Sequence, residues 1–262
     1  MTGTASPAGQ DGAQSIRRAI AVLRIVASGQ ESGVRLTDVA SATGLNRPTV
    51  HRILRALVEE GAVEQQPVTR RYLIGTEVSL LGLARPAGFP LRSLAAQHLH
   101  HIGEVLGETA FLTIRKGDDS GCLARALGSY PIKVLSIEVG ARRLLGVGVS
   151  GVVLLASLPY EEAVEMMRRN AGRLRGLRLD AQDILERCAA ARMLGYAYTA
   201  TGVVRGTRAV AVPVPSPAGE TVAGIAGTAI SARLTESRLL HAVQVMQEQA
   251  RLIGEKIGQR RR

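Results

Sequence analysis

The chain has 262 residues, of which 46% are hydrophobic, and it carries a formal net charge of +11. This length accommodates two domains, and the composition is typical of globular proteins, which excludes collagen-like and fully disordered classes. The sequence contains no apolar run long enough to cross a bilayer, and its positive charge favours a polyanionic partner.

The first 14 residues have neither the basic start nor the continuous apolar segment of a signal peptide. We interpret residues 1–14 as a disordered tail and expect a cytoplasmic protein with no membrane partner. The two cysteines, Cys122 and Cys188, lack neighbours at metal-ligand spacing, so neither a disulfide scaffold nor a zinc site is predicted. This cysteine usage is typical of a reducing compartment.

Two short helices are predicted first. Residues 15–27 have apolar side chains at helical spacing that are expected to face inward. These are Ile16, Ala19, Ile20, Leu23 and Val26. Residues 36–43 follow, with Thr37 as N-cap candidate, Asp38 in the positive first turn, and Gly44 as a left-handed C-terminal cap.

A third helix is predicted to begin near Arg47, because Asn46 can cap it and Pro48 suits its first turn. Its apolar stripe consists of Val50, Ile53, Leu54 and Leu57. The opposite face carries Pro48, Arg52, Arg55 and Glu59, flanked by Thr49 and His51. Guanidinium, imidazole and hydroxyl groups suit contacts with phosphates and base edges. The pair of helices joined at Gly44 therefore predicts a helix-turn-helix; the alternative is a helical hairpin with a solvated charged face.

Residues 62–65 and 71–74 are extended runs around a turn at 67–69, which predicts a β-hairpin. In a winged head the hairpin tip lies beside the duplex backbone, where Arg70 and Arg71 could contact phosphates; a solvated turn is the alternative. A short helix at 77–84, preceded by Thr76, is followed by a proline-containing breaker. We therefore interpret residues 76–90 as the domain linker.

The first part of the chain resembles the N-terminal winged helix-turn-helix of the IclR family of bacterial transcription regulators. Three ordered runs carry the resemblance: SIRRAIAVL (15–23), LTDVASATGLNRPTVHRILRALVEEGAVE (36–64) and RRYLIGTEVSLLG (70–82). Within them, Ala40, Gly44 and Val50 have helix-turn-helix spacing. The resemblance implies that residues 15–75 bind DNA, and that the linker helix joins this head to a sensor and helps to pair subunits.

Seven residues of the head are predicted to contact DNA. We expect Arg52 and Arg55 to reach base edges, with Thr49 and His51 next. We assign Arg47, Arg70 and Arg71 to phosphates.

The second domain is predicted to begin with a helix at 91–106, followed by strands at 109–115 and 121–126 that pair across a polar turn. His98 and His101 stand three residues apart in the helix. No carboxylate, Cys or distant His pair completes a tetrahedral ligand set, so no metal is predicted.

The glycines Gly146, Gly148 and Gly151 spell the G-x-G-x-x-G motif of dinucleotide sites. The helix after them is stopped by Pro159, and no acidic residue follows at the end of a second strand. Tight backbone packing before a buried helix is the favoured interpretation. Ser150 lacks the second glycine of a nucleophile elbow, and no Ser, Asp, His order follows, so nothing favours an enzyme.

The remaining elements predict helices flanking a mostly antiparallel sheet, which is an α+β domain. The helices are 161–170, 180–194 with Asp180 as cap, and 239–257; the strands are 196–201, 207–214 and 222–231. Cys188 falls at core spacing in the second helix and is interpreted as core filler.

The second domain resembles the effector domain of the same family through VGARRLLGVGVSGVVLLA, GYAYTATGVVRGTRAVAVPV and GETVAGIAGTAI. The resemblance thus covers nearly all of residues 15–258. It implies a GAF-like sensor, residues 91–262, that binds a small organic molecule, often a carboxylate or aromatic acid. Carried over position by position, the site is lined by Val149, Ser150, Thr199, Ala209, Ala226 and Thr228.

Several departures from the family pattern bear on the ligand. Relatives that take small oxoacids have an acid, a thiol and two hydroxyls on the last two strands, where this chain has Thr199, Ala209, Ala226 and one hydroxyl at Thr228. Gly202 replaces a frequent Glu, and Gly146 replaces a frequent His. A site with fewer polar anchors favours a larger or more apolar effector, because polar groups of a ligand are costly to bury without hydrogen-bond partners.

We therefore predict an α+β protein with a winged helix-turn-helix head and a GAF-like effector domain. Its expected function is that of a sequence-specific repressor of the IclR type, acting on double-stranded operator DNA as a homodimer or dimer of dimers. A small organic effector, aromatic or acyl carboxylate, is expected to modulate binding, with no cofactor. An activator of the same architecture and an enzyme with a vestigial head are the alternatives.

Overall fold

The structure is a computed structural model that describes residues 8–84, 90–199 and 202–259. The chain forms two compact units, Met1–Gly88 and Phe89–Arg262. Residues 1–7 of the expected tail and residues 85–89 of the expected breaker lie outside the described residues. The first helix begins at Ala8, so residues 8–14 are helical where a disordered tail was expected.

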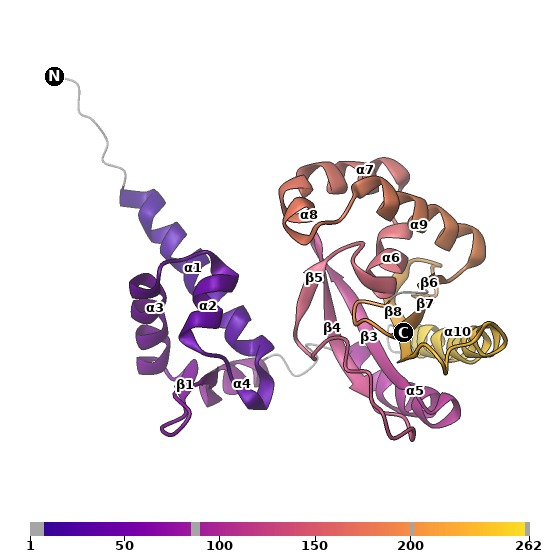
Figure 1. The fold of residues 1–262 in the computed structure, drawn as a ribbon, viewed down its shortest axis with the longest axis horizontal. Coiled ribbons are helices and arrows are strands. Elements are labelled where there is room, and N and C mark those ends of the chain that lie inside the picture. Colours follow the sequence, from indigo (N-terminus) through magenta and orange to yellow (C-terminus); the bar gives the residue numbers. More distant parts are fainter. Residues whose placement is uncertain (1–7, 85–89, 200–201, 260–262) are drawn as a thin grey trace. The chain divides into compact units, whose positions relative to one another are not determined.

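The N-terminal unit packs helices around a small core closed by a hairpin (Figure 1). Its described elements are α1 (Ala8–Ser28), η1 (Gln30–Ser32), α2 (Leu36–Thr43), α3 (Arg47–Glu59), β1 (Val63–Gln65), β2 (Tyr72–Ile74) and α4 (Thr76–Leu83). The two strands pair antiparallel. The helix-turn-helix and the hairpin predicted from the sequence are thus both present.

The apolar stripe predicted for α1 is buried only in the C-terminal half of the helix. Val22 and Val26 are fully buried in the core, whereas Ile16 is 66% exposed and Ile20 is 43% exposed. The core receives residues only from the C-terminal half of α1, because α2, α3 and β2 pack there. The N-terminal half of α1 therefore presents apolar side chains outward in the single chain.

The ends of α2 and α3 follow from side-chain caps. The Asn46 side chain accepts a hydrogen bond from the Thr49 amide at 2.9 Å, as predicted, and Gly44 is left-handed with φ of 69°. At the start of α2 the cap differs from the prediction. The Asp38 carboxylate accepts from the Arg35 amide at 3.0 Å, so the helix begins at Leu36 and Thr37 lies inside it.

The C-terminal unit contains one sheet flanked by helices. Its described helices are α5 (Pro90–Leu106), α6 (Gly148–Ala156), α7 (Tyr160–Arg169), α8 (Ala171–Leu177), α9 (Ala181–Leu194) and α10 (Glu236–Gln259). Its strands are β3 (Thr109–Lys116), β4 (Asp119–Ala126), β5 (Arg142–Leu144), β6 (Ala197–Thr199), β7 (Thr207–Pro215) and β8 (Thr221–Ile230). Neither β5 nor α8 was expected from the sequence.

The strand order is β5-β4-β3-β8-β7-β6, and each described neighbouring pair is antiparallel. The predicted α+β class is confirmed. Every helix in the described part of the chain is too short or too polar to cross a lipid bilayer.

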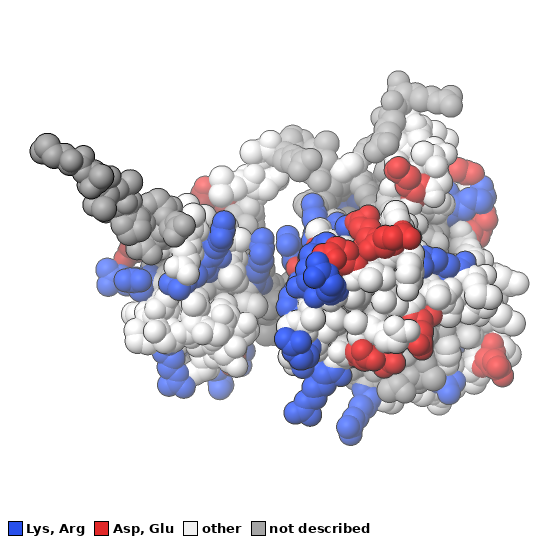
Figure 2. Space-filling model, turned by 90° about the horizontal axis from the view of Figure 1, so that it is seen from above, with Lys and Arg blue, Asp and Glu red and all other residues white. Residues whose placement is uncertain are grey.

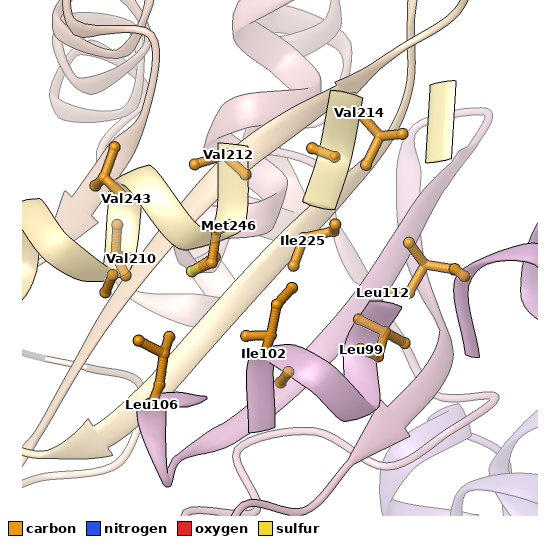
Figure 3. Packing of buried hydrophobic residues seen from close by; sticks show 14 of the residues in the cluster. Leu99, Ile102, Leu106, Leu112, Val210, Val212, Val214, Ile225, Val243 and Met246 are labelled. Carbon is orange, nitrogen blue, oxygen red and sulfur yellow. The ribbon is translucent and has the colours of Figure 1, made fainter. Parts of the chain in front are cut away.

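Alternation along β7 separates two cores, because successive side chains of a strand point to opposite faces. Val210, Val212 and Val214 join the core beneath α5 and α10 (Figure 3). Ala209 and Ala211 join the other core, with α6, α7 and α9. The small side chains on this second face let α6 approach the sheet closely.

Candidate nucleic-acid interface and ligand cavity

The exposed face of α3 carries the side chains expected to read DNA. Arg47, His51, Arg52 and Arg55 are exposed and Thr49 is half-buried, while Val50 and Leu54 on the opposite face are fully buried. Thr49 and Arg52 also border a shallow groove between α1 and α3, to which Arg18 contributes. Because the buried stripe fixes the rotation of α3, the arginine side of the helix must face solvent.

Arg55 is paired with Glu59 one turn later, at 2.9 Å between Nε and Oε1. Both side chains are well exposed, at 75% and 61%, so the pair contributes little to stability. The guanidinium can therefore exchange this partner for a phosphate or a base at small energetic cost.

The two hairpin arginines have different environments. Arg70 lies at the hairpin turn with φ of 57° and is exposed. Arg71 is half-buried, and its Nη1 donates to the Gly33 carbonyl at 3.0 Å. Arg71 therefore ties the hairpin to the segment before α2, and Arg70 is the better placed of the two to meet a phosphate.

Positive charge is not confined to the N-terminal unit. In Figure 2, Lys and Arg side chains are visible on both units, whereas the acidic side chains of that view gather mainly on the C-terminal unit. Among the described residues, no three His, Cys, Asp or Glu side chains are grouped so that they could hold a metal ion. His98 is buried and shares a hydrogen bond of 2.7 Å with Gln249, which gives it a structural partner.

A cavity lies in the C-terminal unit between the start of α6, the alanine face of the sheet and the loop before β5. Its empty volume, including the part that is open to solvent, is about 550 Å³. All six residues assigned to the effector site line it: Val149, Ser150, Thr199, Ala209, Ala226 and Thr228. Residues from α6, β6, β7 and β8, distant in sequence, thus meet in one hollow.

Arg143 is the charged residue among the described residues that line this cavity. Its Nη2 donates to the Ser136 carbonyl, and no carboxylate of the described residues forms an ion pair with it. Burial lowers the pKa of this guanidinium from its ordinary value. A half-buried cation without a counter-charge is costly, so an anion entering the cavity would be stabilised there.

Sequence reasoning missed Arg143 because β5 was not predicted. Within this strand Arg142 is exposed and Leu144 is buried, while Arg143 lies between them at the cavity. The cavity therefore has a charged side chain that the interpretation of the sequence did not include. A strand pattern around Arg142 to Leu144 was the signal that could have found it.

The hydroxyls of the cavity differ in their availability. Thr228 Oγ1 donates to the Val134 carbonyl at 3.1 Å, and Thr207 Oγ1 donates to the Val204 carbonyl at 2.5 Å. Thr113, which was not predicted, is 3% exposed and adds a further threonine hydroxyl to the lining of the cavity.

The glycine motif serves packing. Gly146 has φ of +90°, and a Cβ there would lie 2.7 Å from Ile184 Cγ2. A Cβ at Gly151 would lie 3.0 Å from the Gly146 backbone nitrogen. Neither a histidine nor a carboxylate is among the described residues lining the cavity, so Ser150 has no base beside it there.

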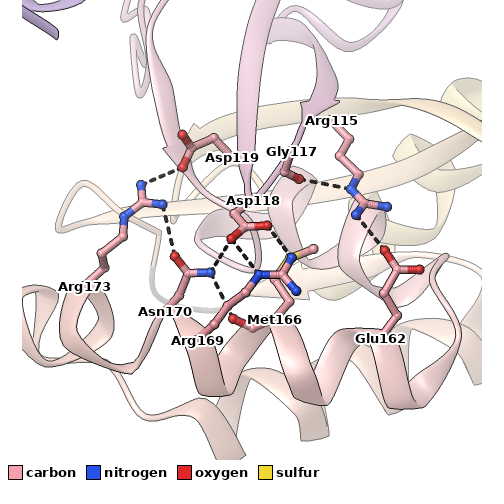
Figure 4. A network of polar contacts seen from close by, with 9 residues as sticks. All are labelled: Arg115, Gly117, Asp118, Asp119, Glu162, Met166, Arg169, Asn170 and Arg173. Carbon is pink, nitrogen blue, oxygen red and sulfur yellow. Dashed lines mark hydrogen bonds and ion pairs between the residues drawn. The ribbon is translucent and has the colours of Figure 1, made fainter. Parts of the chain in front are cut away.

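A polar network anchors the wall of this cavity (Figure 4). The Asp118 carboxylate, in the turn between β3 and β4, accepts from Arg169 Nε at 2.9 Å and from Asn170 Nδ2 at 2.8 Å. Its backbone carbonyl accepts from the Leu145 amide at 2.9 Å. Asp118 therefore links the end of α7 to the segment that connects Arg143 with α6.

Both cysteines are buried. Burial raises the pKa of the Cys122 thiol and of the Cys188 thiol to about 11. Cys188 is fully buried and its Sγ donates to the Val152 carbonyl at 3.7 Å, which agrees with its interpretation as core filler.

Comparison with known proteins yields two family models in the same order as the two units. Residues 15–67 match the IclR helix-turn-helix domain, and residues 87–255 match the bacterial transcriptional regulator IclR C-terminal domain. The second match alone spans more than half of the chain.

Curated relatives are similar over nearly the whole chain. The HTH-type transcriptional repressor AllR of Salmonella typhimurium is 28% identical over 264 residues, covering 98% of this chain and 94% of the relative. The HTH-type transcriptional regulator BhcR of Paracoccus denitrificans is 29% identical, covering 92% and 86%. The glycerol operon regulatory protein of Streptomyces griseus is 41% identical over 101 residues, covering 38% and 39%.

Solved structures share the fold. An IclR transcriptional regulator from Alicyclobacillus acidocaldarius aligns with a TM-score of 0.71 at 22% identity, covering 93% of this chain and 98% of the other. An IclR homologue from Microbacterium hydrocarbonoxydans, complexed with 4-hydroxybenzoate, aligns with a TM-score of 0.67 at 20% identity over 93% and 98%. The chain therefore belongs to the IclR family of bacterial transcriptional regulators, with a DNA-binding head and a C-terminal effector-binding domain.

Proposed function

We propose that this regulator is a cytoplasmic repressor that binds a near-palindromic operator as a homodimer or dimer of dimers and responds to a small organic acid. The observation that carries the proposal is the exposed face of α3, where Arg52, Arg55 and His51 lie opposite the buried Val50 and Leu54. This is the arrangement that a recognition helix needs in a major groove. Repression is inferred from similarity to relatives named as repressors.

We assign the residues of the head three roles: contact with base edges, contact with phosphates, and positioning of the hairpin. Arg52 and Arg55 are proposed to reach base edges, with Thr49 and His51 beside them, and Arg47 and Arg70 to hold phosphates. Arg71, whose guanidinium bonds a backbone carbonyl, is proposed to position the hairpin. Direct base contacts supply specificity, whereas phosphate contacts supply register and salt dependence.

Pairing of heads is supported by exposed apolar side chains in the N-terminal unit. Leu80, Leu81 and Leu83 of α4 are 54%, 65% and 71% exposed, and Ile16 and Ile20 of α1 are also exposed. Such a surface is expected to be covered by a second copy. Two heads in successive major grooves stand about 34 Å apart, which predicts two half-sites one helical turn apart.

The effector site is proposed to be the cavity with Arg143 at its wall, and its ligand an acid. The ligand in the structural relative from Microbacterium hydrocarbonoxydans is 4-hydroxybenzoate, which carries a carboxylate. The effector alters operator affinity only if it binds the DNA-bound and free arrangements unequally.

A gel-retardation experiment on the intergenic DNA upstream of the gene itself, with and without organic acids, tests the proposal. We expect retardation with a steep salt dependence, each neutralised phosphate contributing about −0.9 to the log–log slope. An acid should then release the DNA. Absence of retardation on this DNA and on genome fragments selected by binding would contradict the proposed function, and tighter binding with the acid would contradict effector-induced release.

A further inference from the structure

A second hollow of the C-terminal unit borders the cavity and shares five of its lining residues; we call it the outer groove. Beyond the residues that both share, the outer groove is lined by Gly146, Leu177, Leu179, Ile184 and Arg187. Its space, counted out to solvent, is about 850 Å³. The family resemblance assigned none of these residues a role in binding, apart from the departure at Gly146.

The two hollows meet at Gly148, which lines both. A Cβ at this position would lie 3.8 Å from Arg143 Nη1 and 3.7 Å from Val203 Cγ2. The missing side chain at Gly148 therefore leaves space beside the Arg143 guanidinium and Val203, where the two hollows adjoin. The opposite wall of the cavity is the sheet, where Thr113 is 3% and Ala226 is 4% exposed, so a long ligand can extend only outward.

The outer groove is lined largely by apolar residues. Leu177 is 53% exposed, Leu179 is 37% exposed and Val203 is 56% exposed, and these three side chains border one hollow. Contiguous exposed apolar groups beside a cavity are typical of ligand sites. The combined site therefore has Arg143 inside the cavity, and its outer groove is lined by apolar side chains together with the half-buried Arg187.

We propose that the effector is an amphipathic carboxylic acid whose carboxylate binds Arg143 and whose aliphatic or aryl-alkyl tail runs past Gly148 onto Leu177 and Leu179. This inference rests on the proposed function and specifies the ligand of the same domain. Charge complementarity selects the acid group, because Arg143 forms no ion pair with the described carboxylates. The outer groove, which shares five lining residues with the cavity, provides apolar surface for the tail.

Calorimetry of the full-length protein with straight-chain monocarboxylates from acetate to decanoate, below micelle formation, tests the chain-length dependence. Burial of each methylene is expected to raise affinity by up to about fourfold, and the rise should continue beyond six carbons. The corresponding 1-alkanols are the uncharged controls and should bind at least about tenfold more weakly than the acids. An affinity that stops rising at four carbons, or alcohols that bind as well as acids, would overturn the inference.

Variants separate the two ends of the ligand. The double variant Leu177→Gln with Leu179→Gln should flatten the chain-length dependence of long acids and leave butyrate unchanged. Leu240→Gln, at a leucine that is 59% exposed on α10, is the matched control and should change nothing. Arg143→Gln should weaken acids of all lengths by a similar factor, with partial recovery in Arg143→Lys; melting curves verify that each variant folds.

The outcomes also distinguish this inference from the proposed function. If short acids release the operator and chain length adds nothing, the amphipathic ligand is excluded and the regulator stands. If no acid binds, the inference fails, although retardation of DNA would still support a regulator. Loss of the length dependence in the double variant, with retained DNA binding, would support both.

Discussion

Asp118 illustrates how a single partly exposed carboxylate organises the wall of the cavity. The hydrogen bond from Arg169, followed by that from Asn170, holds the pKa of Asp118 well below its usual range. A depressed folded-state pKa contributes stability above the unfolded value of about 3.9, and this stability is lost as the pH falls through the folded value. The side chain is 30% exposed, so solvent screening reduces the contribution.

We predict that Asp118→Asn lowers the free energy of unfolding by about 1 kcal/mol at pH 7, since charge-assisted hydrogen bonds are lost at a partly screened site. The difference from the parent protein should shrink below about pH 4, where the unfolded carboxylate becomes protonated. Denaturant unfolding at several pH values measures both effects. Glu165→Gln, which removes the partner of Arg168 on the exposed face of α7, is the control and should have a smaller effect. A difference that grows on acidification would contradict this account.

Arg52 is the residue on which base recognition should depend most. Arg52→Ala is expected to cost about 1–3 kcal/mol of operator affinity and to relax specificity at one base pair, if the guanidinium binds a guanine. Fluorescence anisotropy on the operator and on random DNA gives both quantities. Arg92→Ala, an exposed arginine of α5, removes the same charge in the other unit and serves as control. An equal loss on both DNAs would reassign Arg52 to the phosphate backbone.

At the scale of elements, α6 shows how small residues place a helix against a sheet. Residues from Val149 to Ala156, with the exception of Ser150, are buried, and the sheet presents Ala209, Ala211 and Ala226 beneath them. Gly146 completes the approach, because its left-handed backbone and missing side chain let Ile184 of α9 close over the turn. A larger residue at this turn would separate α6 from α9.

We predict that Gly146→Ala destabilises the protein by about 2–4 kcal/mol, the sum of left-handed strain and overpacking against Ile184. Gly219→Ala isolates the strain, because Gly219 also has positive φ, +82°, but nothing within 4 Å of an added Cβ. It should cost about 1–2 kcal/mol. Chemical denaturation of both variants measures the difference. Equal losses would show that the contact with Ile184 is unimportant.

At the scale of the whole molecule, the question is what covers the apolar surface of α1 and α4. A single copy leaves Leu80 and Leu83 more than half exposed, whereas the core of the head draws on other residues. A two-fold interface buries the same patch on both subunits and fixes the spacing of the two heads. Under the proposed pairing of heads, we expect operator recognition to depend on this surface.

The double variant Leu80→Glu with Leu83→Glu is expected to weaken pairing of the heads, because four like charges would be brought together in a dimer. Analytical ultracentrifugation should detect smaller species, and affinity for a full operator should fall towards that for a half-site. Leu240→Glu, on α10, is the control. A variant that keeps both its assembly and its operator affinity would place the interface elsewhere.

Local signals in the sequence sufficed for the elements whose ends are set by neighbouring residues. The Asn46 cap, the left-handed Gly44 and the stripe through Val50 and Leu54 determined α3 and the direction of its arginines, because these interactions span four residues or fewer along the chain. The family resemblance then assigned six residues to one site, and all six line one cavity in the structure.

Tertiary structure decided the features that depend on distant partners. β5 has three residues and is recognisable only through its pairing with β4, and that pairing turns Arg143 into the cavity. Ile16 and Val26 both belong to the stripe predicted from helical spacing, yet only the packing of α2 and α3 decides that Val26 is buried and Ile16 is exposed. Periodicity defines an apolar face, whereas the length over which that face is covered depends on contacts between segments far apart in the chain.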